Sequence, residues 1–169
     1  LPPDSEFMIT MYGAMAQSES ESISGNIRRG RQMHANVGTL KVPCHRLYGY
    51  KKDENEKFCI IPEQAEVVRE IYQRYKDGAS LRNLQDWLEE NQIKTVLGES
   101  RWTTTSIKSI LTNEKYCGDV LLQKTFCTDV ISKKVIKNVG QMAQYYMPDH
   151  HEAIVSREQY NAVKAEMAR

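Results

Sequence analysis

Hydrophobic positions divide the chain into one long N-terminal helix and a later series of short helices and strands. From about Ser5 to about Ala35, apolar residues recur at steps of three and four and no proline intervenes, which predicts a single helix capped by Asp4 or Ser5. Up to Ala16 this segment is apolar on most sides, as expected of a helix buried by more than one neighbour. From Arg28 onward it is basic.

An extended stretch and a hairpin are predicted next. Residues 36–46 are basic, and Gly38 and Pro43 disfavour a helix there, so we expect an extended linker. The stretches 47–52 and 57–61 flank a polar turn, which predicts a short β-hairpin.

Four amphipathic helices are predicted after the hairpin. Pro62 opens one that ends at Asp77-Gly78, Ser80 caps a second, Thr103 or Thr104 caps a third, and Ser156 begins the last. The side chains expected to face the core are Val68, Ile71, Tyr72, Tyr75, Leu81, Leu84, Trp87, Leu88, Ile107, Ile110, Leu111, Tyr160, Val163 and Met167.

Residues 118–136 are rich in Val, Ile, Thr and Leu, which predicts two or three strands, whereas residues 139–150 are polar and predicted to be irregular. The predicted fold class is therefore α+β. It has a long N-terminal helix and then a mainly helical domain with a helix-turn-helix-like pair and small antiparallel β elements.

Composition excludes several protein classes. The 169 residues are 40% hydrophobic and 27% charged, and they contain neither an apolar run of membrane-spanning length nor a secretory signal. The four cysteines form no CxxC pair, so we expect no zinc ribbon, no cofactor, and a reducing cytoplasmic location. The start at Leu-Pro-Pro-Asp, without an initiator methionine, indicates a fragment of a longer protein.

The net charge of +1 hides a strong asymmetry. Residues 28–52 contain seven Lys and Arg and no acid, and residues 93–138 are basic as well. Two separate basic stretches favour a polyanionic partner held at two places. The alternative is a solvated basic face without a partner.

The helices predicted at 81–90 and 104–112 resemble a helix-turn-helix, in which the first helix braces a second that enters the DNA major groove. If Ile107, Ile110 and Leu111 face the core, an acid-free polar face points outward, and short hydroxyls with one lysine can approach base edges. Amphipathic helix pairs are also common in any α-rich core, so this interpretation has a purely structural alternative.

The acid-free basic arm adds a second indication of DNA binding, because such an arm can follow a minor groove while its arginines contact phosphates. The alternative is an interdomain linker that is basic for solubility. The candidate DNA-binding residues are Arg28, Arg29, Arg31, Lys41, Arg46, Lys51, Lys52, Lys94, Arg101, Thr105, Lys108, Ser109 and Thr112.

No catalytic set is predicted. The run Asp149-His150-His151-Glu152 has no second ligand cluster at a spacing that suits a metal, so a turn before the last helix is the preferred interpretation. The hydroxyls of residues 17–22 have no neighbouring base in sequence, which favours a polar helix face.

Ordered motifs run through nearly the whole chain. They are Ala16-Gln17-Ser18-Glu19-Ser20-Glu21-Ser22-Ile23-Ser24 with Arg28-Arg29-Gly30, Leu47-Tyr48-Gly49-Tyr50, Pro62-Glu63-Gln64-Ala65, Ile71-Tyr72, Tyr75-Lys76-Asp77-Gly78, Trp102, Ile107, Ile110-Leu111-Thr112-Asn113, Tyr116-Cys117-Gly118 and His151-Glu152-Ala153-Ile154-Val155. The first resembles the end of the connecting helix of serine recombinases. The others resemble the recombinase domain of the large serine recombinases, which are phage integrases and mobile-element transposases.

This resemblance implies a division of the chain into a connecting helix (1–35), a basic linker (36–46) and a DNA-binding recombinase domain (47–169). In the family, the connecting helix crosses the DNA, the linker enters the minor groove and the helical domain occupies the major groove of an attachment half-site. A separate N-terminal domain carries the serine that forms a phosphoserine link within a synaptic tetramer, and a zinc ribbon usually follows. The resemblance therefore implies a bacterial or mobile-element fragment that binds double-stranded DNA and is inactive alone, with self-association through the N-terminal helix in the intact protein.

Two other functions stay open at this stage. Residues 5–27 could serve a helical oligomerisation module in which the basic arm is incidental. An independent metal-dependent nuclease would have to use Asp149, His151 and Glu152.

Overall fold

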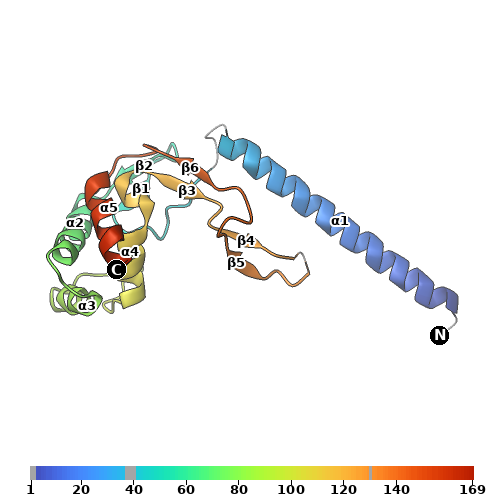
Figure 1. Cartoon of the computed structure of the whole chain (residues 1–169), viewed down its shortest axis with the longest axis horizontal. Helices are drawn as coiled ribbons and strands as arrows, with labels where there is room; N and C mark the ends of the chain where they lie inside the picture. Colours follow the sequence, from blue (N-terminus) through green and yellow to red (C-terminus); the bar gives the residue numbers. More distant parts are fainter. Residues whose placement is uncertain (1–2, 37–40, 130) are drawn as a thin grey trace. The chain divides into compact units, whose positions relative to one another are not determined.

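The computed structural model describes residues 3–36, 41–129 and 131–169 (Figure 1). Contacts divide the chain into two compact units. One unit combines Leu1–Lys41 with Leu122–Tyr145, and the other combines Val42–Leu121 with Tyr146–Arg169. The observed mixture of helices and small antiparallel strand pairs confirms the predicted α+β class. The domain boundaries at 35 and 46 stay a prediction, and residues 37–40 of the linker lie outside the described residues.

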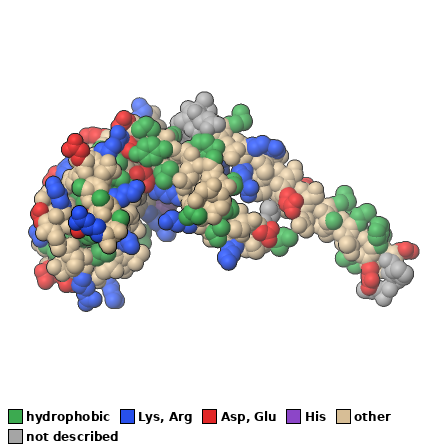
Figure 2. All heavy atoms as spheres, in the orientation of Figure 1, with side chains coloured by type: hydrophobic (Ala, Val, Ile, Leu, Met, Phe, Trp, Pro, Cys, Tyr) green, Lys and Arg blue, Asp and Glu red, His purple; other side chains and the backbone are tan. Residues whose placement is uncertain are grey.

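The first unit begins with helix α1 (Pro3–Asn36), which confirms the predicted long helix. Figure 2 shows hydrophobic side chains on the surface of this helix toward its N-terminal end. Phe7, Ile9 and Tyr12 are 69%, 64% and 62% exposed to solvent. An apolar pattern on most sides of a helix requires several neighbours to cover it, and the described residues of this chain do not supply them. No helix in the described residues is long and apolar enough to cross a membrane.

The first unit also contains a hairpin of strands β4 (Thr125–Cys127) and β5 (Val135–Lys137), paired antiparallel with Phe126 opposite Ile136. The buried Asn138 closes its base. The Asn138 backbone amide donates to the Lys124 carbonyl at 2.8 Å, and its side-chain amide donates to the Gln123 and Met142 carbonyls, also at 2.8 Å.

In the second unit, β1 (Tyr50–Lys52) and β2 (Phe58–Ile60) form the predicted hairpin. Asp53 closes its turn, since the carboxylate accepts from the backbone amides of Asn55 and Lys57. Helices follow, and their bounds are α2 (Pro62–Lys76), α3 (Leu81–Glu90), α4 (Thr104–Thr112), a 3-10 turn η1 (Glu114–Cys117) and α5 (Arg157–Met167). The hydroxyls of Ser80, Thr103 and Ser156 each accept a backbone N–H of the first turn, as N-caps do.

One hydrophobic core joins α2, α3, α4 and α5, and it confirms the predicted inward positions. Two tyrosines from other helices hold the C-terminal end of α4. The Tyr72 hydroxyl of α2 donates to the Ile110 carbonyl at 2.8 Å, and the Tyr160 hydroxyl of α5 donates to the Thr112 carbonyl at 3.1 Å. These bonds add partners to carbonyls in the last turn of α4, where the regular i+4 backbone donors are missing.

Strand β3 (Val120–Leu122) pairs with β6 (Tyr145–Met147). The prediction that residues 139–150 are irregular is therefore wrong at β6. Its partner strand lies more than twenty positions earlier in the sequence, so the local composition could not reveal the pairing.

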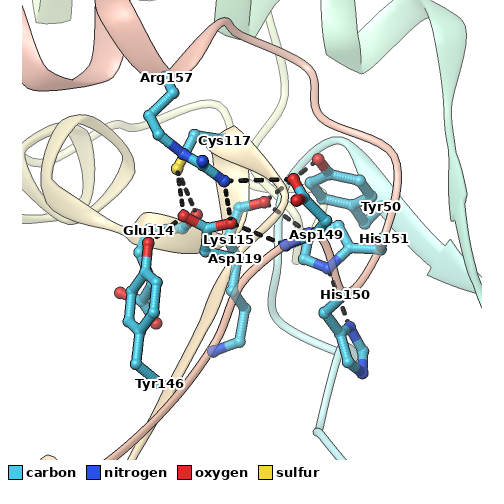
Figure 3. Close-up of polar contacts among 10 residues, drawn as sticks. All are labelled: Tyr50, Glu114, Lys115, Cys117, Asp119, Tyr146, Asp149, His150, His151 and Arg157. Atoms are coloured by element: carbon cyan, nitrogen blue, oxygen red, sulfur yellow. Dashed lines mark hydrogen bonds and ion pairs between the residues drawn. The ribbon is translucent and has the colours of Figure 1, made fainter.

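Asp119, directly before β3, is a fully buried carboxylate that ties the N-terminal end of α5 to its surroundings (Figure 3). It accepts from the Arg157 guanidinium at 2.7 Å, from the Asp149 backbone amide at 3.0 Å, and from the Tyr146 hydroxyl. Burial acts to raise the pKa of this carboxyl, but the hydrogen bonds from Tyr146, Asp149 and Arg157 outweigh burial and hold the pKa below its ordinary value.

Because the pKa of Asp119 is lower in the folded than in the unfolded chain, its contribution to stability is present above the unfolded pKa, near 3.8, and lost as the pH falls below it. We predict that the free energy of unfolding declines below about pH 4 and that Asp119→Asn reduces this decline. Urea unfolding at pH 7, 5, 4 and 3 measures the free energy of unfolding of the unmodified chain and of Asp119→Asn. The exposed Asp86→Asn is the matched control, and an equally steep acid decline in Asp119→Asn would contradict the assignment.

Gly118 gives a second stability prediction. Its φ is +89°, and an added Cβ would lie 2.7 Å from the His151 carbonyl oxygen. Gly78 has a φ of +99° but open space around it. We therefore expect Gly118→Ala to lower the free energy of unfolding by about 2–4 kcal/mol and Gly78→Ala by about 1 kcal/mol. Thermal and urea unfolding measure both, and equal losses would show that the close approach is unimportant.

Candidate nucleic-acid interface

Helix α4 is held with one face inward and the other exposed. Its start is a capping box, in which the Thr103 hydroxyl accepts from the Ser106 amide at 3.1 Å and the Ser106 hydroxyl accepts from the Thr103 amide at 3.3 Å. Ile107, Ile110 and Leu111 are buried. The orientation of α4 follows from these contacts together with the tyrosine bonds at its other end.

The outward face of α4 has the predicted composition. Thr105, Lys108, Ser109 and Thr112 are all exposed, and no carboxylate stands among them. The Thr112 hydroxyl donates back to the Lys108 carbonyl at 2.8 Å, so it is engaged with its own helix. This surface can approach a polyanion without a like-charge penalty.

A loop of residues 91–103 joins α3 to α4, longer than the three or four residues usual in a helix-turn-helix. Trp102 anchors its end: the indole N–H donates to the Ile93 carbonyl at 2.7 Å, and the Trp102 amide donates to the Glu89 carboxylate at 3.0 Å. The predicted residues Lys94 and Arg101 lie exposed in this loop, and the Lys94 ammonium donates to the Ser100 hydroxyl.

The exposed face of α4 borders a groove of about 460 Å³. Arg46 and Ser109, both predicted, line it together. Its apolar side includes the Tyr48 and Trp102 rings, which meet edge to face with centroids 5.3 Å apart. Tertiary packing therefore brings Arg46, from before the first hairpin, beside a helix more than fifty positions later.

A second hollow of about 390 Å³ contains the other basic residues of the first hairpin. Lys51 and Lys52 line it with His45 and Gln64, and Val96 borders both hollows. Lys51 is exposed, whereas Lys52 is half-buried and pairs with Glu56 at 2.9 Å. Within this unit, Arg46 and Lys51 are the predicted cations most open to a ligand beside these hollows.

The remaining predicted cations belong to the first unit. Arg28, Arg29 and Arg31 are exposed on the last third of α1, and Lys41 is exposed directly after the undescribed residues 37–40. The Arg29 guanidinium donates to the Asn26 side chain at 2.5 Å. Arg28 and Arg31 line a shallow groove of about 290 Å³ whose other lining includes residues of β4 and β5.

His150 and His151, predicted to lie in a turn, pack against the first hairpin (Figure 3). The His151 ring stacks on Phe58 at 4.6 Å and meets Tyr50 edge-on at 4.9 Å. Its Nε2 bonds the Lys115 carbonyl, so this nitrogen carries the proton, and its Nδ1 lies 3.0 Å from His150 Nδ1.

Burial lowers the pKa of both His150 and His151, and the positive charges of Lys115 and, at His150, Lys52 act in the same direction. Two neutral rings are compatible with this chain of hydrogen bonds. Nothing in the described part of the chain gathers three or more His, Cys, Asp or Glu into a possible metal site. The cluster therefore anchors the loop before α5 to the first hairpin.

Sequence reasoning missed several groups beside the groove. Thr95, Val96 and Asn113 line it but belong to a loop and a helix end that gave no periodic signal. Away from the groove, the sequence indicates the exposed lysines of the β4–β5 hairpin only as members of a basic stretch. Their number in a short segment with one acid was the signal that could have identified them.

Comparison with known proteins identifies the family of this chain. The family model described as Recombinase matches residues 62–169. A protein of Bacillus subtilis (strain 168) named "Putative DNA recombinase" is 26% identical over 123 residues, which cover 69% of this chain and 24% of the relative. The chain thus spans about a quarter of that curated relative.

Two solved structures share the fold. One, "Crystal Structure of a LSR-DNA Complex", has a TM-score of 0.54, and the match covers 85% of this chain and 39% of that chain. The other, "Sequence Requirements of the Listeria innocua prophage attP site", has a TM-score of 0.53 and covers 85% and 51%. Each is 24% identical to this chain. Since the family model accounts for well over half of the sequence, the chain belongs to the Recombinase family, as its motifs predicted.

Proposed function

We propose that this chain is a DNA-binding part of a site-specific recombinase and that it holds one attachment half-site. The observation that carries the proposal is the acid-free outer face of α4 beside the groove lined by Arg46 and Ser109. A helix that is fixed from behind and displays hydroxyls and a lysine suits major-groove reading. Membership of the Recombinase family and a fold shared with a large serine recombinase–DNA complex support it.

The proposal assigns different tasks to the predicted residues. Thr105, Lys108 and Ser109 would face base edges, with Thr112 at the far end of the same face. The cations would contact phosphates, and this set consists of Arg28, Arg29, Arg31, Lys41, Arg46, Lys51, Lys52, Lys94 and Arg101. In this proposal, residues 36–46 follow the minor groove between the connecting helix (1–35) and the recombinase domain (47–169). Cleavage and rejoining through phosphoserine belong to a separate catalytic domain, as in the family that the chain resembles.

A second role, self-association, is favoured by the exposed apolar residues of α1. Phe7, Ile9, Tyr12 and Met15 are each more than 60% exposed, which is costly unless a partner covers them. We propose that this segment contacts other subunits in the intact recombinase. An interaction module that does not bind DNA would rest on this feature alone.

The self-association role predicts concentration-dependent assembly of this chain. Ile9→Glu and Tyr12→Glu should shift sedimentation toward the monomer, because a charge in an apolar interface loses its hydration. Glu6→Gln, beside them on α1, is the control. Monomeric behaviour of the unmodified chain at high concentration would contradict the proposal.

DNA binding is tested by fluorescence anisotropy with a labelled random-sequence duplex over a salt series, together with selection of preferred sites from a random duplex library. We expect Arg46→Ala to weaken binding to all duplexes alike and to reduce the salt slope by about 1. We expect Thr105→Ala or Lys108→Ala to change the selected sequence, with a loss of about 1–3 kcal/mol on the site preferred by the unmodified chain.

Lys76→Ala, which removes an exposed lysine at the end of α2, is the charge-matched control for Arg46→Ala and Lys108→Ala. Equal losses on selected and random duplexes for every variant would remove groove reading and leave only electrostatic binding. No salt-dependent binding by the unmodified chain would refute the proposed function.

A further inference from the structure

The β4–β5 hairpin is basic, and none of the candidate DNA-binding residues lies in it. Its lysines are Lys124, Lys133, Lys134 and Lys137, and all four are exposed. Between Lys124 and Pro148 the sequence contains a single acid, Asp129. Residues 124–137 therefore have four positive charges and one negative charge, a local excess of three positive charges.

The one acid of this segment is engaged by the turn. One Asp129 carboxylate oxygen accepts from the Ile131 amide at 3.2 Å, and the other accepts from the Ser132 amide at 3.3 Å. Its backbone carbonyl accepts from the Lys133 amide at 3.0 Å. Because a backbone N–H group binds each oxygen of this carboxylate, its charge is partly compensated locally, and the four lysines outnumber it.

The hairpin holds its lysines in defined positions. Near the tip, the Thr128 amide donates to the Lys134 carbonyl at 2.9 Å, and Lys137 stands opposite Thr125 in the strand register. At the base, the three hydrogen bonds of Asn138 close the ribbon. A pre-ordered ribbon loses less conformational entropy on binding than a flexible loop does.

The exposed side chains of the hairpin also suit a nucleic-acid groove. Val135 and Ile131 are 64% and 69% exposed beside the lysines, while Phe126 and Ile136 share the half-buried opposite face. A two-stranded ribbon fits the DNA major groove, and apolar side chains can contact thymine methyls or widen a minor groove. Flanking lysines then reach the phosphates on either side.

We propose that the β4–β5 hairpin is a second DNA-binding element, whose lysines bind phosphates of the duplex outside those contacted from α4. This inference rests on the proposed function, because it requires that the chain binds duplex DNA. It adds a contact that the recombinase domain makes through a β-ribbon rather than through its helices.

The test compares two double variants in salt titrations on the random-sequence duplex. The hairpin variant is K133N/K134Q: Lys133 has a φ of +50°, which asparagine adopts more readily than other residues, so the charge is removed without added strain. The control variant is K76Q/K164Q, which removes two exposed lysines from α2 and α5. Thermal unfolding checks that both variants stay folded.

If both hairpin lysines contact phosphates, the salt slope falls by about 1.8, and the loss of affinity is roughly tenfold greater at 50 mM than at 200 mM salt. The control slope is unchanged. On a duplex selected with the unmodified chain, phosphate ethylation should interfere at positions that become insensitive in the hairpin variant.

Other outcomes separate the two proposals. Salt-dependent binding by the unmodified chain, with equal slopes in the hairpin and control variants, would overturn the hairpin contact and leave the proposed function standing. The hairpin would then be a surface for another partner, such as an acidic protein. No binding by the unmodified chain would overturn both.

Discussion

The fixed position of α4 is the constraint on which the rest of the candidate site depends. Ile107 and Leu111 are fully buried. The hydroxyls of Tyr72 and Tyr160 donate hydrogen bonds to backbone carbonyls at the end of the helix. Burial alone is non-directional and would allow the helix to slide or rotate, whereas these directional hydrogen bonds set its register. The contacts of the buried face of α4 therefore decide which of its residues are exposed.

Hydrogen bonds to a buried group also fix the loop before α5. Asp119 gathers Arg157, Tyr146 and the Asp149 amide, and next to it the His150–His151 pair packs on Phe58. A buried carboxylate is costly unless its charge is paired and its lone pairs are used, so it specifies one arrangement of the loop before α5. The polar residues that resemble a metal site in sequence thus stabilise the fold, since Asp149 pairs with Arg157 and His151 stacks on Phe58 and meets Tyr50 edge-on.

Positive charge is distributed over several structural elements. Arginines lie on the end of α1, Arg46 and Lys51 lie beside hollows of the second unit, and lysines line the β4–β5 hairpin. A near-neutral chain can hold a polyanion in this way because acids are concentrated elsewhere, as on α3 with Asp86, Glu89 and Glu90. Separate contacts also allow base reading and phosphate binding to be assigned to different elements.

The sequence by itself determined the helices, their caps and their inward faces, because these depend on residues three or four positions apart. It also determined the exposed composition of α4 and, through its motifs, the family. Only the tertiary structure decided that Arg46 and Ser109 line one groove and that β6 pairs with β3. These features join residues distant in sequence, and local periodicity contains no information about either.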